Sequence, residues 1–132
     1  MTGAWHILVA DDDAELRAWL RLALRPIAAV VEEVGSGQAL LDRIADGDPV
    51  DAVVTDVRMP GPDGLKVVAM ARTAGLDVPI LVSTAFPDRA VRHTVAALDR
   101  TVLLAKPFEV DAFREALRHL IEGRGPEFSA ES

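Results

Sequence analysis

Residues Ala52-Val53-Val54-Thr55-Asp56 form a short apolar run that ends on a carboxylate. Short continuous runs of this kind are typical of strands buried on both faces of a parallel sheet. The carboxyl ends of such strands line one edge of the sheet, and ligands bind in the crevice there. Three other runs also end on polar side chains: Ile7–Ala10 on Asp11 and Asp12, Ile80–Ser83 on Thr84, and Val102–Ala105 on Lys106.

Segments with helical spacing of apolar residues separate these runs. Pro26, Gly47, Gly75 and Gly123 mark the ends of four of these segments. A further apolar run at residues 28–34 brings the pattern to five strand–helix units. We therefore predict an α/β fold, a flavodoxin-like doubly wound five-stranded parallel sheet of order 2-1-3-4-5 with five helices. In that order the run at 28–34 is an edge strand, and it carries no predicted site residue.

Composition narrows the classes of function. The 132 residues suit one domain, which we place at 5–122, with a flexible C-terminal tail or linker stub at 123–132. A net charge of −7 argues against nucleic-acid binding by this domain, and the absence of cysteine excludes thiolate chemistry. No signal peptide and no apolar run of roughly 18 residues is present, which predicts a cytoplasmic location. Gly35-Ser36-Gly37 lacks the third glycine of a nucleotide-binding fingerprint and fits a helix cap.

Asp11, Asp12 and Asp13 form an acidic triplet directly after the first run. Acidic residues at a helix start can simply cap the helix, and this alternative suits Asp13 in any case. Asp11 and Asp12 lie at the strand end itself, near Asp56 in the predicted sheet. Carboxylate oxygens are the ligands that Mg²⁺ prefers, and three such groups repel one another unless a cation lies between them. Asp11, Asp12 and Asp56 together predict a divalent metal site.

Asp56 lies at the centre of this predicted site. It could be an ordinary turn residue, but a carboxylate can also act as a nucleophile and form an aspartyl-phosphate. A bound Mg²⁺ would lower the repulsion between Asp56 and an incoming phosphoryl group. We interpret Met59-Pro60 and Asp63-Gly64 as turn residues, in which Pro60 fixes φ and Gly64 permits a positive φ.

Thr84 and Lys106 supply the remaining polar groups at this edge. The Thr84 hydroxyl could donate to a phosphoryl oxygen, although strand propensity alone also explains a threonine there. Ser83 is the competing hydroxyl, but strand alternation would turn it to the other face. Lys106 is one of only two lysines beside twelve arginines, and an ammonium directly after an apolar strand suits phosphate binding. Pro107 is a candidate for a cis peptide bond.

These motifs resemble the receiver domain of a two-component response regulator, in the CheY-like superfamily. The resemblance covers about residues 5–122, and its motifs occur in the family's order and spacing. They are Asp11-Asp12, Asp56 with Met59-Pro60 and Asp63-Gly64, Thr84-Ala85, and Lys106-Pro107-Phe108.

The resemblance implies a role for each residue at this edge. Asp56 would be the phosphoacceptor, taking a phosphoryl group from a histidine kinase or phosphotransfer protein. The implied ligands of Mg²⁺ or Mn²⁺ are Asp11, Asp12, Asp56 and the backbone carbonyl of Arg58. Contacts to the phosphoryl group would come from Thr84, the Ala85 backbone and Lys106. The change would then pass to the surface of the fourth helix, fifth strand and fifth helix.

The expected function is a regulatory switch rather than an enzyme, with only self-catalysed phosphoryl transfer and autodephosphorylation. The switch would control a downstream protein target or an output domain outside this sequence, as a monomer or weak dimer without membrane contact. One alternative is a pseudo-receiver that only binds partners. Another is a magnesium-dependent phosphatase of haloacid-dehalogenase type, but that family's pattern has a second aspartate at position 58, which is Arg58 here.

The chain departs from the receiver pattern at two places. Leu103 occupies the position where many receivers carry an aromatic switch residue, and Asp99-Arg100 replaces a frequent Gly-Ala pair, so we expect a differently shaped turn there. We also predict that Arg58 and Phe86 overhang the site, because each lies two residues after a site residue. Phe86 would screen attacking water and lengthen the lifetime of the phosphoryl group.

Overall fold

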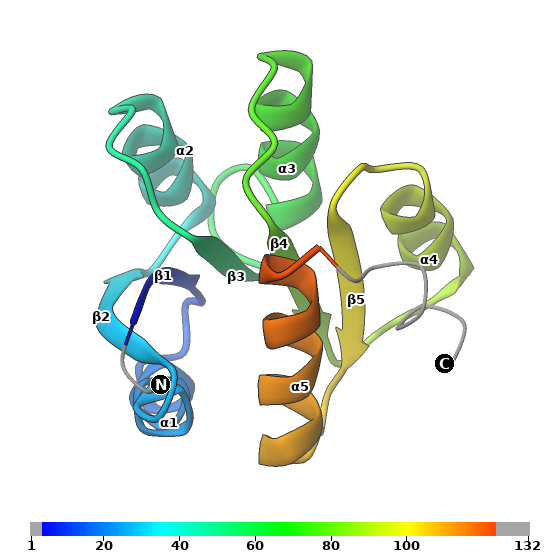
Figure 1. Cartoon of the computed structure of the whole chain (residues 1–132). Coiled ribbons are helices and arrows are strands. Elements are labelled where there is room, and N and C mark those ends of the chain that lie inside the picture. The colour runs from blue at the N-terminus through cyan, green and yellow to red at the C-terminus, as the bar shows by residue number, and fades with distance from the viewer. Residues whose placement is uncertain (1–3, 124–132) are drawn as a thin grey trace.

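The computed structural model describes residues 4–123, in which five strands alternate with five helices (Figure 1). Apart from Gly123, the predicted tail at 123–132 lies outside the described residues. The longest helix has 12 residues, and no helix in the described part of the chain is long and apolar enough to cross a membrane. The elements are β1 (Trp5–Ala10), α1 (Ala14–Leu24), β2 (Ala28–Val34), α2 (Gly37–Ala45), β3 (Ala52–Asp56), α3 (Gly64–Thr73), β4 (Ile80–Thr84), α4 (Arg89–Ala96), β5 (Thr101–Ala105) and α5 (Val110–Ile121).

The strands form one parallel sheet in the order β2-β1-β3-β4-β5, which confirms the predicted fold. The register explains why the polar strand ends come together. Ala10 of β1 pairs with Thr55 of β3, so Asp11 and Asp56, the next residues, are level with each other. On the other side, Thr84 pairs with Ala105, directly before Lys106.

Each face of the sheet is covered by helices and forms its own hydrophobic core (Figure 1). Successive residues of a strand point to opposite faces, so both faces of these apolar strands need a cover. On one face α1 and α5 pack Leu24, Phe113 and Leu117 against residues such as Ile7. On the other face α2, α3 and α4 pack against residues such as Leu8.

Local sequence signals set the helix boundaries. The side chains of Asp13, Ser36, Asp63 and Asp88 each accept a hydrogen bond from a backbone N–H in the first turn of α1, α2, α3 and α4. Three helices end shortly before a glycine with a positive φ, which an L side chain rarely adopts. These glycines are Gly47, Gly75 and Gly123.

The turn between α4 and β5, where Asp99-Arg100 predicts a different shape, has one unusual backbone angle. Arg100 has a φ of 49°, the one positive value among the described non-glycine residues. The guanidinium of Arg72, at the end of α3, donates to the main-chain oxygens of Asp99 at 2.8 Å and Arg100 at 3.1 Å. It also donates to the carbonyls of Leu76 and Val78 in the loop before β4. One side chain therefore fastens this turn to the end of α3.

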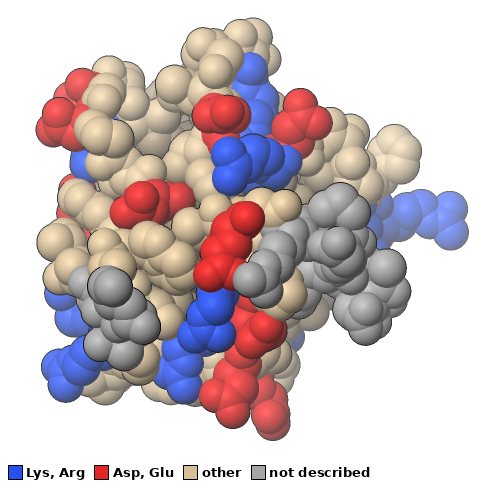
Figure 2. Space-filling model, in the orientation of Figure 1, with Lys and Arg blue, Asp and Glu red and all other residues tan. Residues whose placement is uncertain are grey.

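Charged side chains of both signs are interspersed on the face shown in Figure 2. Acidic and basic groups alternate there in small clusters instead of gathering by sign. The described residues of this face therefore present no broad basic field of the kind that binds a phosphate backbone. Absence of nucleic-acid binding stays a prediction for the whole domain.

Candidate functional site

The carboxyl edge of the sheet brings Asp11, Asp12 and Asp56 together. One carboxylate oxygen of each lies within 4.8 Å of those of the other two. Asp11 is only 2% exposed and Asp56 is half-buried, whereas Asp12 is exposed. The two deeper carboxylates are thus fixed by the sheet, and the third faces solvent at the rim.

Asp11 is held by a hydrogen bond at each of its three oxygen atoms. Its Oδ1 accepts from the backbone N–H of Asp13 at 2.9 Å, and its Oδ2 from Lys106 Nζ at 3.1 Å. Its main-chain oxygen accepts from an Arg17 guanidinium nitrogen at 2.6 Å. A carboxylate bonded in this way has one orientation, which pre-forms this part of the acidic cluster.

The Lys106 ammonium lies between the two deeper carboxylates. Its Nζ is 3.1 Å from Asp11 Oδ2 and 3.4 Å from Asp56 Oδ2. Its backbone N–H donates to the carbonyl of Thr84 at 2.8 Å, which extends the β4–β5 pairing to the start of the loop. The following peptide bond, to Pro107, is cis. Lys106 therefore places a positive charge next to Asp56, where an incoming anion would arrive.

Burial and two charged neighbours act on the carboxyl group of Asp56. Burial raises the pKa of its carboxyl group, Lys106 lowers this pKa, and Asp11 raises it, with a net upward shift. Its Oδ1 accepts from the backbone N–H of Val57 at 2.7 Å, which leaves Oδ2 facing Lys106. The ionised carboxylate is therefore costly in the protein without a bound cation, and a divalent cation beside it would lower that cost.

Gly64 has a different role from the one predicted. Its φ is not positive, and the positive φ in this loop belongs to Gly61, at 80°. A Cβ atom on Gly64 would lie 2.0 Å from the main-chain oxygen of Asp56. Glycine is needed there because the start of α3 packs directly on the backbone of Asp56, a close approach that spacing alone does not reveal.

Thr84 is buried at the end of β4, and the Asp56–Ser83 pair of the register lies one residue deeper in the sheet. The Thr84 Oγ1 accepts from the backbone N–H of Phe86 at 3.1 Å. In the described residues this hydroxyl is not hydrogen-bonded to Asp56 or Lys106. Ala85 is exposed beside it. The structure thus places Thr84 and Ala85 at the predicted edge without a direct bond to the acidic cluster.

Arg58 and Phe86 contact each other. The Arg58 guanidinium carbon lies 4.8 Å from the centroid of the Phe86 ring, within the range of a cation–π interaction. Phe86 is 59% exposed, so this contact joins the loop after β3 to the loop after β4 at the protein surface. Leu103, at the aromatic-switch position, is half-buried and packs against the core under α4.

The donor set of the cluster fits a hard divalent cation. Three carboxylates converge, and all the offered atoms are oxygen, as Mg²⁺ and Mn²⁺ prefer. In the loop after β3, the carbonyls of Val57 and Pro60 accept from the N–H groups of Gly64 and Gly37. No described residue donates to the carbonyl of Arg58, which leaves that oxygen available as a ligand.

Sequence reasoning missed Arg17 and Glu33. Arg17 binds the main-chain oxygen of Asp11 and, through Nε, Glu33 Oε1 at 3.1 Å. Arg21 donates to the other oxygen of Glu33, and these two arginines hold the pKa of Glu33 below its usual range. Acidic residues near the end of β2 were the available signal, but their partners on α1 are brought close only by the tertiary fold.

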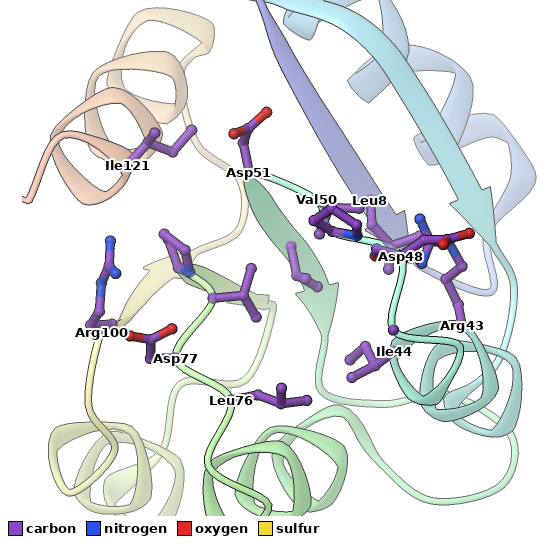
Figure 3. Close-up of a pocket in the computed structure, with 15 residues that line it drawn as sticks. Leu8, Arg43, Ile44, Asp48, Val50, Asp51, Leu76, Asp77, Arg100 and Ile121 are labelled. Carbon is purple, nitrogen blue, oxygen red and sulfur yellow. Dashed lines mark hydrogen bonds between the residues drawn. The ribbon is translucent and has the colours of Figure 1, made fainter.

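Two cavities differ in their relation to this site. A cavity of about 470 Å³ lies at the opposite, amino-terminal edge of the sheet. Figure 3 shows Arg43 and Asp48 on one side of it and Asp77 and Arg100 on the other. A second cavity, of about 420 Å³, adjoins Lys106 and lies between α1 and the loop after β5. Its apolar lining comes from Leu16, Trp19, Ala85, Pro107 and Phe108.

Comparison with known proteins identifies the family of this chain. Residues 7–118 match the family model described as the response regulator receiver domain. The response regulator MprA of Mycobacterium tuberculosis is 42% identical over 129 residues, which cover 96% of this chain and 55% of the relative. The chain therefore spans about half the length of the curated relatives it matches.

Solved structures give the same result. A response regulator receiver protein from Sinorhizobium medicae is 30% identical with a TM-score of 0.79, covering 92% of this chain and 97% of that one. The receiver domain of a Francisella response regulator has a TM-score of 0.80 at 21% identity, covering 92% and 99%, and supports the fold alone. The predicted resemblance is confirmed: this chain belongs to the receiver domains of two-component response regulators, which are signalling proteins rather than classical enzymes.

Proposed function

We propose that this chain is a phosphorylation-dependent switch in which Asp56 accepts a phosphoryl group from a histidine kinase or phosphotransfer protein. The observation that carries the proposal is the position of Lys106 Nζ, 3.1 Å from Asp11 and 3.4 Å from Asp56. A cation fixed beside a nucleophilic carboxylate stabilises the negative charge of a transferring phosphoryl group. The receiver unit is proposed to comprise residues 5–122.

Mg²⁺ or Mn²⁺ would be held by Asp11, Asp12, Asp56 and the Arg58 carbonyl. When bound, the metal neutralises charge on the acidic cluster and on the phosphoryl oxygens. Asp11 needs little reorganisation, because three hydrogen bonds already fix its oxygen atoms. The exposed Asp12 carboxylate would complete the set from the rim of the site.

In the transfer step an Asp56 carboxylate oxygen attacks phosphorus, and the P–N bond of the donor phosphohistidine breaks. The imidazole leaves with the bonding electron pair and is protonated. Lys106 moves from the carboxylates to a phosphoryl oxygen. The Thr84 hydroxyl, which now accepts from Phe86 N–H, can still donate its own proton to the phosphoryl group. Attack by water on phosphorus later breaks the P–O bond to Asp56, releases inorganic phosphate and restores the carboxylate.

The output is proposed to pass through the surface of α4, β5 and α5. Lys106 follows β5 directly, and its backbone is bonded to Thr84 at the end of β4. A displacement of Lys106 or Thr84 therefore acts on the strand that carries Leu103. The controlled element is proposed to be a downstream protein or an output domain, with this domain a monomer or weak dimer that binds no nucleic acid.

The proposal is tested by intact mass after incubation with acetyl phosphate. With MgCl₂ the native chain is expected to gain the mass of one phosphoryl group, and with a chelator in place of MgCl₂ it is expected to gain none. Peptide mapping then assigns the modified residue. Failure of a folded native chain to gain mass from acetyl phosphate and from a phosphorylated phosphotransfer protein would favour the pseudo-receiver alternative.

Phe86→Ala is expected to shorten the lifetime of the phosphorylated state severalfold. The Phe86 ring and Arg58 guanidinium form a contact between the two loops beside the site, and its loss would give water easier access to the phosphoryl group. Dephosphorylation is followed by intact mass after removal of the phosphodonor. Leu22→Ala is the matched control, because Leu22 is also 59% exposed but lies on α1. An unchanged rate in Phe86→Ala would contradict this role.

A further inference from the structure

The peptide that joins Asp11 to Asp12 is held from one side by Arg17. The main-chain oxygen of Asp11 belongs to this peptide, and an Arg17 guanidinium nitrogen donates to it at 2.6 Å. On the other side of the chain, the backbone N–H of Asp11 pairs with the carbonyl of Val34. The Arg17 bond therefore restrains the plane of the Asp11–Asp12 peptide, and the Val34 bond restrains the preceding Ala10–Asp11 peptide. Together they limit the direction in which the Asp12 side chain leaves the backbone.

The orientation of this peptide is important because no other contact in the described residues fixes the position of the Asp12 carboxylate. It is exposed, and no hydrogen bond from a described residue fixes its oxygen atoms, in contrast to Asp11 and Asp56. Its convergence with the other two carboxylates therefore depends on the backbone that carries it. An exposed aspartate on a free backbone would lose conformational entropy on binding a cation.

The Arg17 guanidinium is itself anchored. Its Nε donates to Glu33 Oε1 at 3.1 Å, and Arg21 Nε donates to Glu33 Oε2 at 2.8 Å. Gly35 leaves room for it, since a Cβ there would lie 3.3 Å from the Arg17 nitrogen. The planar guanidinium reaches Asp11 and Glu33 at the same time, which the single ammonium of a lysine cannot reproduce.

We infer that Arg17, anchored by Glu33, is a positioning residue that orients the Asp11–Asp12 peptide so that Asp12 converges on the divalent cation. The inference rests on the metal site of the proposed function. It assigns to the edge strand β2, through Glu33, a part in metal binding without a metal ligand of its own. Residues that orient metal ligands typically change metal affinity about 10-fold or more when removed.

The direction of the change in the Kd for Mg²⁺ distinguishes a positioning role of Arg17 from an effect of its charge. Arg17 is a cation near the acidic cluster, so removal of its charge alone would tighten Mg²⁺ binding. Loss of the orientation of the Asp11–Asp12 peptide would instead weaken Mg²⁺ binding. We expect Arg17→Ala to raise the Kd for Mg²⁺ about 10-fold, and Arg17→Lys, which keeps the charge, to raise it in the same direction.

The experiment is calorimetric titration of MgCl₂ into the unphosphorylated chain, with no phosphodonor present. Arg25→Ala is the charge control, because it removes an equal charge from an exposed side chain at the end of α1 and leaves the Arg17, Glu33 and Arg21 bonds in place. Its Kd is expected to stay within about twofold of the native value. Glu33→Gln keeps Arg17 and weakens its anchor, so a smaller increase in Kd is expected. Thermal unfolding in the same buffer shows that each variant is folded.

The outcomes distinguish the two claims. Native binding with an unchanged or tighter Kd in Arg17→Ala overturns the positioning role and leaves the proposed function intact. A raised Kd in Arg17→Ala with a native-like Kd in Arg17→Lys would mean that one ammonium is enough, and it overturns the claim that the guanidinium must reach Asp11 and Glu33 together. If the native chain binds no Mg²⁺, the proposed metal site is wrong and the inference falls with it. If Arg17→Ala does not fold, Glu33→Gln decides between the outcomes.

Discussion

Lys106→Met is expected to lower the free energy of unfolding of the metal-free protein by about 2 kcal/mol at pH 7. Methionine keeps the length and packing of the side chain but leaves Asp11 and Asp56 without their shared cation. Removing one partner of a buried ion pair costs more than the pair contributes, because the remaining charge is desolvated and unpaired. Lys106 is 19% exposed, which places the expected cost below that of a fully buried pair.

The same substitution is expected to reduce phosphoryl uptake from acetyl phosphate by about 100-fold. Mg²⁺ should restore much of the lost stability, since it can neutralise the same carboxylates, but it should not restore the rate. Urea unfolding with and without MgCl₂ measures the first effect, and intact mass against time measures the second. Lys66→Met is the matched control, because Lys66 is the chain's other lysine and is exposed on α3. Equal stability losses in the two variants would contradict the role of Lys106.

Asp56→Asn is expected to abolish phosphoryl uptake and to stabilise the metal-free protein by about 1 kcal/mol at pH 7. Asparagine has the shape of aspartate, and its Oδ1 can still accept from the Val57 N–H. It carries no charge, so the cost of burying the carboxylate beside Asp11 disappears. The increase corresponds to a rise in Tm of about 4 °C for a domain of this size.

The pH dependence of this difference has a defined sign. The pKa of Asp56 is raised in the folded protein, so the folded state binds the proton more tightly than the unfolded state. The stability that this proton contributes is fully present below the unfolded pKa of about 3.9, and it is lost as the pH rises through the folded pKa. Asp56→Asn should therefore gain stability over the native chain as the pH rises through this window.

Thermal unfolding between pH 3 and pH 8 compares the two chains without metal. Asp46→Asn, at an exposed carboxylate after α2, is the control and should follow the native profile. If Asp56→Asn were only as stable as the native chain at every pH, the ionised Asp56 carboxylate would not destabilise the folded protein. Added MgCl₂ should reduce the stability difference between Asp56→Asn and the native chain, since it stabilises the native chain alone.

The fold and the acidic cluster could be predicted because both follow from local patterns. Each strand is a short apolar run, and the residue after its end lies at the carboxyl edge in any parallel sheet. Asp11, Asp56 and Lys106 were found in this way. The N-cap role of Asp13 could likewise be predicted from its place between a strand and an apolar helical stripe.

What could not be predicted depends on contacts between distant segments. Arg17 and Glu33 are 16 residues apart and meet only because α1 packs beside β2. The role of Gly64 was assigned to a positive φ, whereas the structure shows a steric limit set by the backbone of Asp56. The contact between Arg58 and Phe86 was foreseen only as a shared location, because spacing does not give ring and guanidinium orientation.

The hydrogen bonds from Arg72 to the α4–β5 turn have a consequence for how related sequences can diverge. Arg72 binds Asp99 and Arg100 through their main-chain oxygens, which every amino acid carries. Arg72 therefore holds the turn through atoms that stay the same when these side chains change, while the positive φ of Arg100 restricts the residue at that position. On the proposed output surface, substitutions beside this turn would change the side chains offered to a partner and leave the backbone held by Arg72 in place.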